Sequence, residues 1–167
     1  FDLSYDGSVQ ASAKRIKSWT VGDTHYTKTD TYRLERDLSM KYHLIPVDGS
    51  KKFLDDIMNT IEPFDYNDLI DFNHSYLSGF LAEKYDLASD EAIKDAQDRA
   101  LNSTLNESRK TMQGYNSVNI QSHHLNVIDT NITYALLPVW MVNVKYKDKY
   151  YLFAMNGQTG EFIGNMP

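Results

Sequence analysis

The sequence contains no cysteine. This absence excludes disulfide bonds, thiol nucleophiles and cysteine-ligated zinc within the 167 residues. It does not distinguish a reducing from an oxidising compartment, because cysteine-free domains occur in both. Any stability must therefore come from packing and hydrogen bonding, and a chain of this length is long enough to bury a core of its own.

The sequence also lacks a long hydrophobic run. Its longest apolar stretch, from Tyr134 to Val142, is interrupted by Pro138 and is far shorter than the roughly 20 residues of a spanning helix. We therefore expect a soluble domain whose membrane contact, if any, comes from segments outside it. Because the chain opens at Phe1 rather than at methionine, we expect a fragment of a longer protein.

Motifs that would identify an enzyme are missing as well. We find no G-x-S-x-G elbow, no phosphate-binding loop and no calcium loop, and Gly157 and Gly160 read as turn glycines. His123 and His124 are adjacent, so on a strand they point to opposite sides and do not share a metal. We predict a non-enzymatic chain without a catalytic, metal or cofactor site. A metal-dependent hydrolase using the acidic segment and His74, with Asp71 and Asp68 as further ligands, is the more distant alternative.

Charge is plentiful but unevenly distributed. The net charge is −6, yet residues 9–44 contain seven basic and four acidic residues, whereas residues 53–98 contain two basic and twelve acidic ones. The acidic total argues against general nucleic-acid binding, although the first segment alone can still contact phosphate. Aromatic content of 13 %, chiefly tyrosine, favours a sheet-rich globular protein.

The C-terminal stretch specifies a structure most clearly. Lys147-Asp148 separates two apolar, β-branched and aromatic runs and is predicted to be a two-residue hairpin turn. That register pairs Trp140 with Met155 and Val142 with Phe153 on one side, which we expect to be the core. The Asn156–Gly160 turn then leads into a short last strand, giving a three-stranded antiparallel meander.

The remaining elements complete an α+β prediction. Residues 90–112 carry an apolar, small-residue stripe typical of a helix lying on a sheet, capped by Ser89, and we place this long helix on the C-terminal sheet. Short helices are predicted over residues 52–61 and 75–85. A weakly alternating strand, 118–127, leads from the long helix toward the meander. The best candidate boundary divides residues 1–50 from 51–167, and one continuous domain is the alternative.

The N-terminal part is predicted to be an exposed β-ribbon. Residues 9–36 form a hairpin closed at Gly22-Asp23, and a third strand follows over 38–47. Basic and aromatic side chains interleave on this ribbon in a pattern that suits contact with a partner or a phosphate. These candidate interaction residues are Lys14, Arg15, Lys17, Trp19, Tyr26, Lys28 and Arg33.

Several stretches are similar to a known family. YALLPVW and YKDKYYLFAMNGQTGEFIG, with VDGSKK, IEPFDYNDLIDF and YLSGFLAEKYD upstream, resemble the C-terminal part of a bacterial, mostly Firmicute, family of unknown function. Its members carry an N-terminal zinc ribbon and C-terminal transmembrane helices and are often labelled TFIIB-type zinc-ribbon or primosomal-helicase-like proteins. Asp148 stands where that family's turn has glycine. A shorter similarity, carried by SDEAIKDAQ and the TGE turn, is to PepSY-type modules.

The resemblance implies a membrane-anchored parent protein that bears a zinc ribbon. Because zinc-binding cysteines are best kept reduced in the cytosol, it also implies that this domain lies on the cytoplasmic side. We predict a protein-interaction or scaffolding module with a protein partner. Binding of a nucleic acid or an anionic surface through the basic aromatic hairpin is the alternative. Neither a catalytic nor a binding residue is implied by the resemblance.

Overall fold

The structure, a computed structural model, describes residues 1–51 and 55–164 and confirms the α+β class. The chain forms two compact units, each discontinuous in sequence. The first unit comprises Phe1–Pro46 and Ile93–Ile132, and the second comprises Val47–Ala92 and Thr133–Pro167. This division differs from the sequence-based boundary near residue 50, because residues 93–132 return to the N-terminal strands.

Each unit contains one antiparallel sheet of three strands. The sheet of the first unit has the order β2-β1-β3, and that of the second has the order β4-β5-β6. No helix in the described part of the chain combines the length and the apolar character needed to cross a bilayer. The elements are β1 (Asp2–Val21), β2 (Thr24–Tyr42), α1 (Asp55–Thr60), the 3-10 turns η1 (Tyr66–Asp68) and η2 (His74–Leu77), α2 (Ser89–Thr111), β3 (Ser117–Asn131), β4 (Val139–Tyr146), β5 (Lys149–Asn156) and β6 (Phe162–Gly164).

The N-terminal hairpin has the predicted turn and register. Gly22 adopts a φ of 59° at the first central position of the two-residue turn, which is where a type II′ turn needs glycine. Trp19 pairs with Tyr26, and Lys17 pairs with Lys28, as the spacing predicts. The strands are longer than expected, however, and the predicted third strand over 38–47 is wrong: residues 38–42 continue β2.

One face of this first sheet is the core of the first unit. Alternate residues of β1, among them Val9, Ala11 and Ala13, are completely buried. Val9 and Ala11 pack with Met112, which directly follows the helical residues 89–111, and with partly buried leucines of β2 and of that helix. The sequence predicts an exposed ribbon here, because Ala11 and Ala13 are too small to mark an apolar face.

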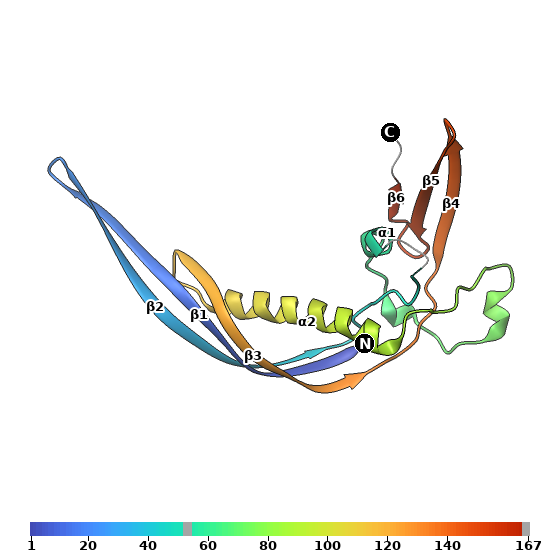
Figure 1. Ribbon diagram of the computed structural model, residues 1–167, viewed down its shortest axis with the longest axis horizontal. Coiled ribbons are helices and arrows are strands. Elements are labelled where there is room, and N and C mark those ends of the chain that lie inside the picture. The colour runs from blue at the N-terminus through green and yellow to red at the C-terminus, as the bar shows by residue number, and fades with distance from the viewer. Residues whose placement is uncertain (52–54, 165–167) are drawn as a thin grey trace. The chain divides into compact units, whose positions relative to one another are not determined.

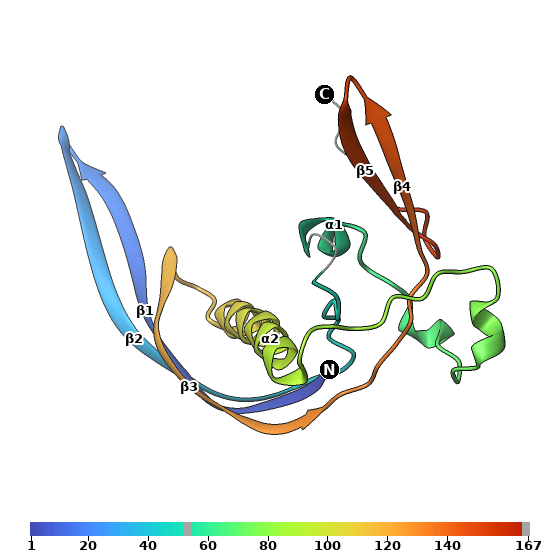
Figure 2. The same ribbon diagram turned by 45° about the vertical axis from the view of Figure 1, so that its right-hand side comes forward.

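Helix α2 therefore packs on the N-terminal sheet, which corrects the predicted placement on the C-terminal one. Ala96, Ala100 and Thr104 recur every four residues and are almost completely buried, as the predicted small-residue stripe requires. The Tyr42 hydroxyl lies 2.7 Å from the Thr104 hydroxyl, and the Tyr5 hydroxyl donates to the Gln97 carbonyl at 3.1 Å. Figures 1 and 2 show α2 running beside β1 and β3. The prediction was wrong because the strand after α2 was expected to lead into the C-terminal meander. In the structure this strand, β3, pairs with β1 instead.

The pairing of β1 with β3 requires a glycine at its centre. Gly7 has a φ of 149°, and a Cβ added there would lie 1.9 Å from the backbone oxygen of His124. Two register shifts, at Ser4/Tyr5 and at Gln10/Ala11, interrupt this pairing. Such bulges bend a strand and increase its twist, so they fit the curvature that β3 shows in Figure 1.

The C-terminal hairpin also has the predicted register, but its faces are exchanged. Trp140 pairs with Met155 and Val142 with Phe153, yet Trp140 is 60 % exposed and Val142 is 55 % exposed. The expectation that this side is the core is wrong. The opposite side, with Ala154 and Met141, packs instead against Ile61 and Phe64.

A buried asparagine explains why that side is the core. Asn156 is fully buried, and its Nδ2 donates to the carbonyl oxygens of Ile61 at 2.8 Å and Pro63 at 3.1 Å. Its Oδ1 accepts from the backbone N–H groups of Gln158 at 2.8 Å and Thr159 at 3.1 Å. All four hydrogen-bonding positions of the amide are thus used, which fixes the side of the sheet that faces residues 61–63.

The acidic segment between α1 and α2 differs from its prediction. Residues 75–85 were expected to form a helix with a buried side, but the structure has only η2 there, with Asn73 accepting from the Ser75 N–H at 2.9 Å. Phe80 is 64 % exposed, and Leu81 is completely exposed. Of the predicted helix over 52–61, α1 covers residues 55–60, and residues 52–54 lie outside the described part of the chain.

Candidate interaction site on the N-terminal ribbon

The end of the β1–β2 hairpin is a two-stranded ribbon. The third strand, β3, pairs with β1 only as far as Lys14, which faces Ser117. Beyond that point β1 and β2 pair only with each other, up to the turn at Gly22-Asp23. Figure 1 shows this ribbon, at the left-hand end of the first unit, continuing past β3 and past the end of α2.

Cross-strand side-chain contacts hold this ribbon in register. The hydroxyls of Ser18 and Thr27 lie 3.2 Å apart, and the Thr20 hydroxyl lies 3.2 Å from Nδ1 of His25. On the other side of the ribbon the rings of Trp19 and Tyr26 stack, with centroids 5.7 Å apart and planes at 12°. Such pairs stabilise a sheet by roughly 0.2–1 kcal/mol each. These contacts stabilise the ribbon where it has no third strand.

The pairing register sorts the seven predicted interaction residues onto two faces. Because side chains alternate along a strand, Arg15, Lys17 and Trp19 share one face with Tyr26 and Lys28. Lys14 and Arg33 lie on the opposite face. The structure thus brings five of the seven residues together and separates the other two.

Arg15 has a role within the first unit. Its guanidinium lies 5.5 Å from the centroid of Tyr32 and 5.3 Å from that of Tyr115, and its Nε donates to the Gly114 carbonyl at 3.3 Å. These contacts connect β1 to the loop that follows α2. Sequence reasoning missed Tyr115 as a partner, because its contact depends on where that loop returns to the ribbon.

Arg33 is also used within the sheet. Its Nη2 donates to the Gln10 side chain at 3.0 Å, and the Gln10 amide donates to Glu35 at 3.1 Å. This row lies on the face away from α2. Arg15 and Arg33 are therefore less suited to a partner contact than the sequence pattern indicates.

Four residues nearest the turn remain, and we call them the tip face: Lys17, Trp19, Tyr26 and Lys28. Trp19 is 47 % exposed and Tyr26 is 45 % exposed, so neither ring belongs to a core. Lys17 and Lys28 are direct cross-strand neighbours, and the Asp30 carboxylate lies 3.2 Å from the Lys28 ammonium. That carboxylate offsets the repulsion expected between two adjacent lysines.

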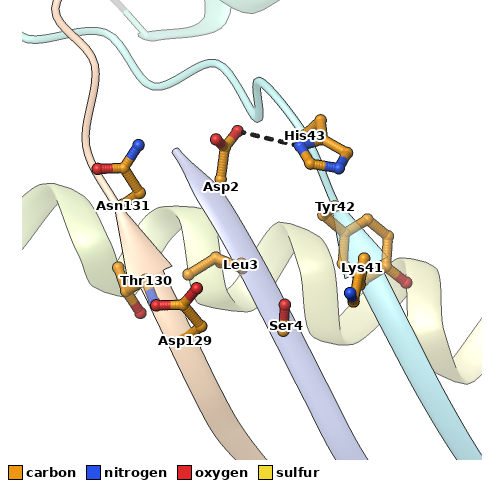
Figure 3. A pocket seen from close by; sticks show the side chains of 9 residues that line it. All are labelled: Asp2, Leu3, Ser4, Lys41, Tyr42, His43, Asp129, Thr130 and Asn131. Atoms are coloured by element: carbon orange, nitrogen blue, oxygen red, sulfur yellow. Dashed lines mark hydrogen bonds and ion pairs between the residues drawn. The ribbon is translucent and has the colours of Figure 1, made fainter.

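A shallow hollow of about 490 Å³ lies at the other end of the first sheet. Figure 3 shows Asp2 and His43 pointing toward one another at its rim, with 3.7 Å between the Asp2 carboxylate and Nδ1 of His43. The N–H of Leu44 donates to Asp2 at 2.9 Å, and this bond is the main reason that the pKa of Asp2 is lowered. The remaining lining residues are Leu3, Ser4, Lys41, Tyr42, Asp129, Thr130 and Asn131.

The contacts of this hollow join the N-terminus of β1 to the segment that follows β2. Asp2 is occupied by a backbone N–H and so holds the chain beyond β2 against the start of β1. Over residues 1–51 and 55–164, no cluster of three or more His, Asp or Glu side chains is arranged to hold a metal ion. His123 and His124 occupy successive positions of β3, paired with Val9 and Ser8. His74 lies in η2 with its ring edge on Phe72, at a centroid distance of 5.1 Å, and Asp68 ends η1.

Comparison with known proteins gives one informative similarity. No family model matches the chain, and no solved structure matches it. The chain is 38 % identical over 167 residues to the uncharacterised protein YdjG of Bacillus subtilis (strain 168). The match covers all of the chain but 49 % of that relative, so the chain spans about half the length of the curated relative it matches.

Proposed function

We propose that the chain is a non-enzymatic protein-interaction module and that the tip face contacts the partner. The supporting observation is the stacked, half-exposed pair of Trp19 and Tyr26 on a ribbon that extends beyond the last residue paired with β3. Tryptophan and tyrosine are enriched among the residues that dominate protein interfaces. Lys17 and Lys28 beside them favour a partner surface that carries acidic side chains.

The geometry of the ribbon suits such a contact. A two-stranded hairpin with an ordered turn presents its side chains without having to fold on binding, which lowers the entropic cost of association. The rings of Trp19 and Tyr26 already stack on each other, so little side-chain freedom remains to be lost. The tip face is small, and we expect it to act together with other surfaces of the intact protein.

We further propose that the intact protein is membrane-anchored and bears a zinc ribbon, with this region on the cytoplasmic side. The resemblance of the quoted motifs to that family supports this proposal. It is compatible with a relative, YdjG, that is about twice as long as the chain and therefore has room for additional segments. Protease protection in intact cells and in inverted membrane vesicles tests the side: cleavage of this region only in inverted vesicles supports the proposal.

The interaction proposal is tested by co-purification from cross-linked cells that express the intact protein. The double variant Trp19→Ala/Tyr26→Ala is expected to lose the partner, whereas the matched variant Ser18→Ala/Thr27→Ala, at the adjacent cross-strand pair on the opposite face, keeps it. Hairpin integrity is checked by amide exchange in both variants. Equal recovery of the partner with both double variants contradicts the assignment of the tip face.

Nucleic-acid binding is the second candidate, and the two lysines beside the aromatic pair are the observation that favours it. Because Trp19 and Tyr26 stack on each other, and because Asp30 neutralises Lys28, we place it second. If Lys17 and Lys28 are the phosphate contacts, a plot of the logarithm of the binding constant for single-stranded DNA against the logarithm of the salt concentration has a slope of about −1.4. Binding that is independent of salt, or unchanged in Lys17→Glu, contradicts this candidate.

A further inference from the structure

The C-terminal sheet has one face made mostly of apolar side chains, with Tyr146 and Lys149 at its turn end. Because partners across an antiparallel pair share a face, the register places residues of all three strands on it. Trp140 and Phe162 are both 60 % exposed, and Val142 is 55 % exposed. We call this the open sheet face; its residues are Trp140, Val142, Val144, Tyr151, Phe153, Met155 and Phe162.

An antiparallel sheet with one apolar exposed face is half of a sandwich. Two such sheets bury their faces by packing about 10 Å apart with strands aligned to within roughly 30°. On the open sheet face Phe153 and Phe162 already stack, with centroids 5.7 Å apart, so the aromatic side chains are ordered before any contact forms. The opposite face of the same sheet is occupied by residues 57–64 and cannot serve.

The charges at the two ends of the sheet indicate which partner fits. The turn end carries Lys145, Lys147 and Lys149 with one acidic residue, Asp148, whereas the open end carries Glu161 beside Phe162. An anionic lipid surface would attract the first end and repel the second. A copy of the same sheet, rotated so that its strands run in the opposite direction, places basic end over acidic end twice.

We propose that the open sheet face binds the same face of a second copy of this chain. The two-fold axis lies between the sheets and perpendicular to the strands. An axis parallel to the strands would stack the three lysines of one copy over those of the other, and like charges disfavour that arrangement. This proposal does not depend on the role of the tip face.

The size of the face sets the strength of the dimer. Two strands of eight residues and one of three fit within about 27 Å by 14 Å, or no more than roughly 400 Å² per copy. Stable complexes bury about 800 Å² per partner, so the pairing is weak and reversible, with a dissociation constant on the order of micromolar or weaker. It is favoured where the local concentration is high.

Sedimentation equilibrium of the 167-residue chain from about 5 to 500 µM tests the proposal, with the range set by the expected weakness of the interface. The wild-type mass is expected to rise toward that of a dimer. Trp140→Glu and Val142→Lys each raise the dissociation constant by tenfold or more, and Asn143→Lys, on the opposite face, leaves it unchanged. Trp140 and Val142 lie outside the core, so both variants are expected to fold. A cooperative unfolding transition in each variant checks this expectation.

A charge exchange tests the direction of packing. Lys149→Glu and Glu161→Lys each weaken the dimer by about 2- to 30-fold, because the two-fold axis repeats each like-charge contact. The double variant Lys149→Glu/Glu161→Lys restores wild-type affinity if the two ends meet, and failure to restore it overturns the arrangement.

A wild type that stays monomeric at all concentrations overturns the proposal; the face is then covered by the chain's own acidic segment or binds another partner. Self-association that persists in both face variants overturns it as well.

Discussion

Replacing Asn156 by alanine is expected to destabilise the second unit strongly. Its side-chain amide makes four hydrogen bonds at 2.8–3.1 Å, joining the end of β5 to residues 61 and 63 and to the turn at 158–159. At roughly 0.5–1.5 kcal/mol per bond, their loss costs about 2–6 kcal/mol. The upper part of this range applies if the two carbonyl oxygens, in a fully buried site, gain no water.

The assay combines urea unfolding with amide hydrogen exchange. Exchange at Gln158 and Thr159 is expected to accelerate, because their N–H groups lose the Asn156 acceptor, while amides of β1 keep their protection. Asn143→Ala, an exposed position on the neighbouring strand, serves as the control and changes stability by less than about 0.5 kcal/mol. A loss below about 1 kcal/mol for Asn156→Ala, or exchange unchanged at both turn amides, would refute the reasoning.

Three further outcomes are expected. Gly7→Ala places a methyl group against the His124 carbonyl and costs several kcal/mol in chemical unfolding, since backbone cannot move aside as a flexible side chain can; a loss within about 1 kcal/mol contradicts this packing. Asp148→Gly raises the thermal midpoint of the second unit, because Lys147 and Asp148 both have positive φ, a conformation that glycine adopts more easily. The exposed Lys145–Asp148 ion pair that the substitution removes contributes little. A lower midpoint contradicts the assigned turn. The Leu44 N–H lowers the pKa of Asp2, so the ionised Asp2 contributes its full stability above the unfolded pKa of about 3.9 and loses it as the pH falls further. The difference in unfolding free energy between wild type and Asp2→Asn is therefore expected to shrink at pH 3. A difference that does not change with pH contradicts this sign.

Local pairing could be predicted from the sequence, because its determinants are local. Gly22-Asp23 and Lys147-Asp148 are each flanked by runs of alternating or β-branched residues, and both hairpins have the predicted register. The small-residue stripe of α2 likewise identified the buried side of that helix, since Ala96, Ala100 and Thr104 repeat at helical spacing. In each case turn chemistry and periodicity agree.

Long-range packing could not be predicted in the same way. Both sides of the β4–β5 hairpin contain apolar residues, and the more apolar side, with Trp140, is the exposed one. Its opposite side is buried because Asn156 and Ala154 meet residues 61–64, which are far away in the chain, with 95 positions between Asn156 and Ile61. The partner of α2 was missed for the same reason, because it depends on the return of β3 to β1.

The candidate site was found in part. Basic and aromatic spacing identified the ribbon, and alternation alone separates Lys14 and Arg33 from the tip face once the register is known. The internal role of Arg15 was not visible, since Tyr115 reaches it from the loop after α2. A bare count of charges cannot distinguish an arginine that joins two elements from one that awaits a partner.

A photo-cross-linking scan along β1, in cells that express the intact protein, tests the tip-face assignment most directly. The photoreactive residue is placed singly at each position from Ile16 to Val21. The account predicts partner adducts that alternate, present at 17, 19 and 21 and absent at 16, 18 and 20, because only one face of the ribbon meets the partner. Adducts of equal yield at all six positions, or only at the even ones, would contradict it.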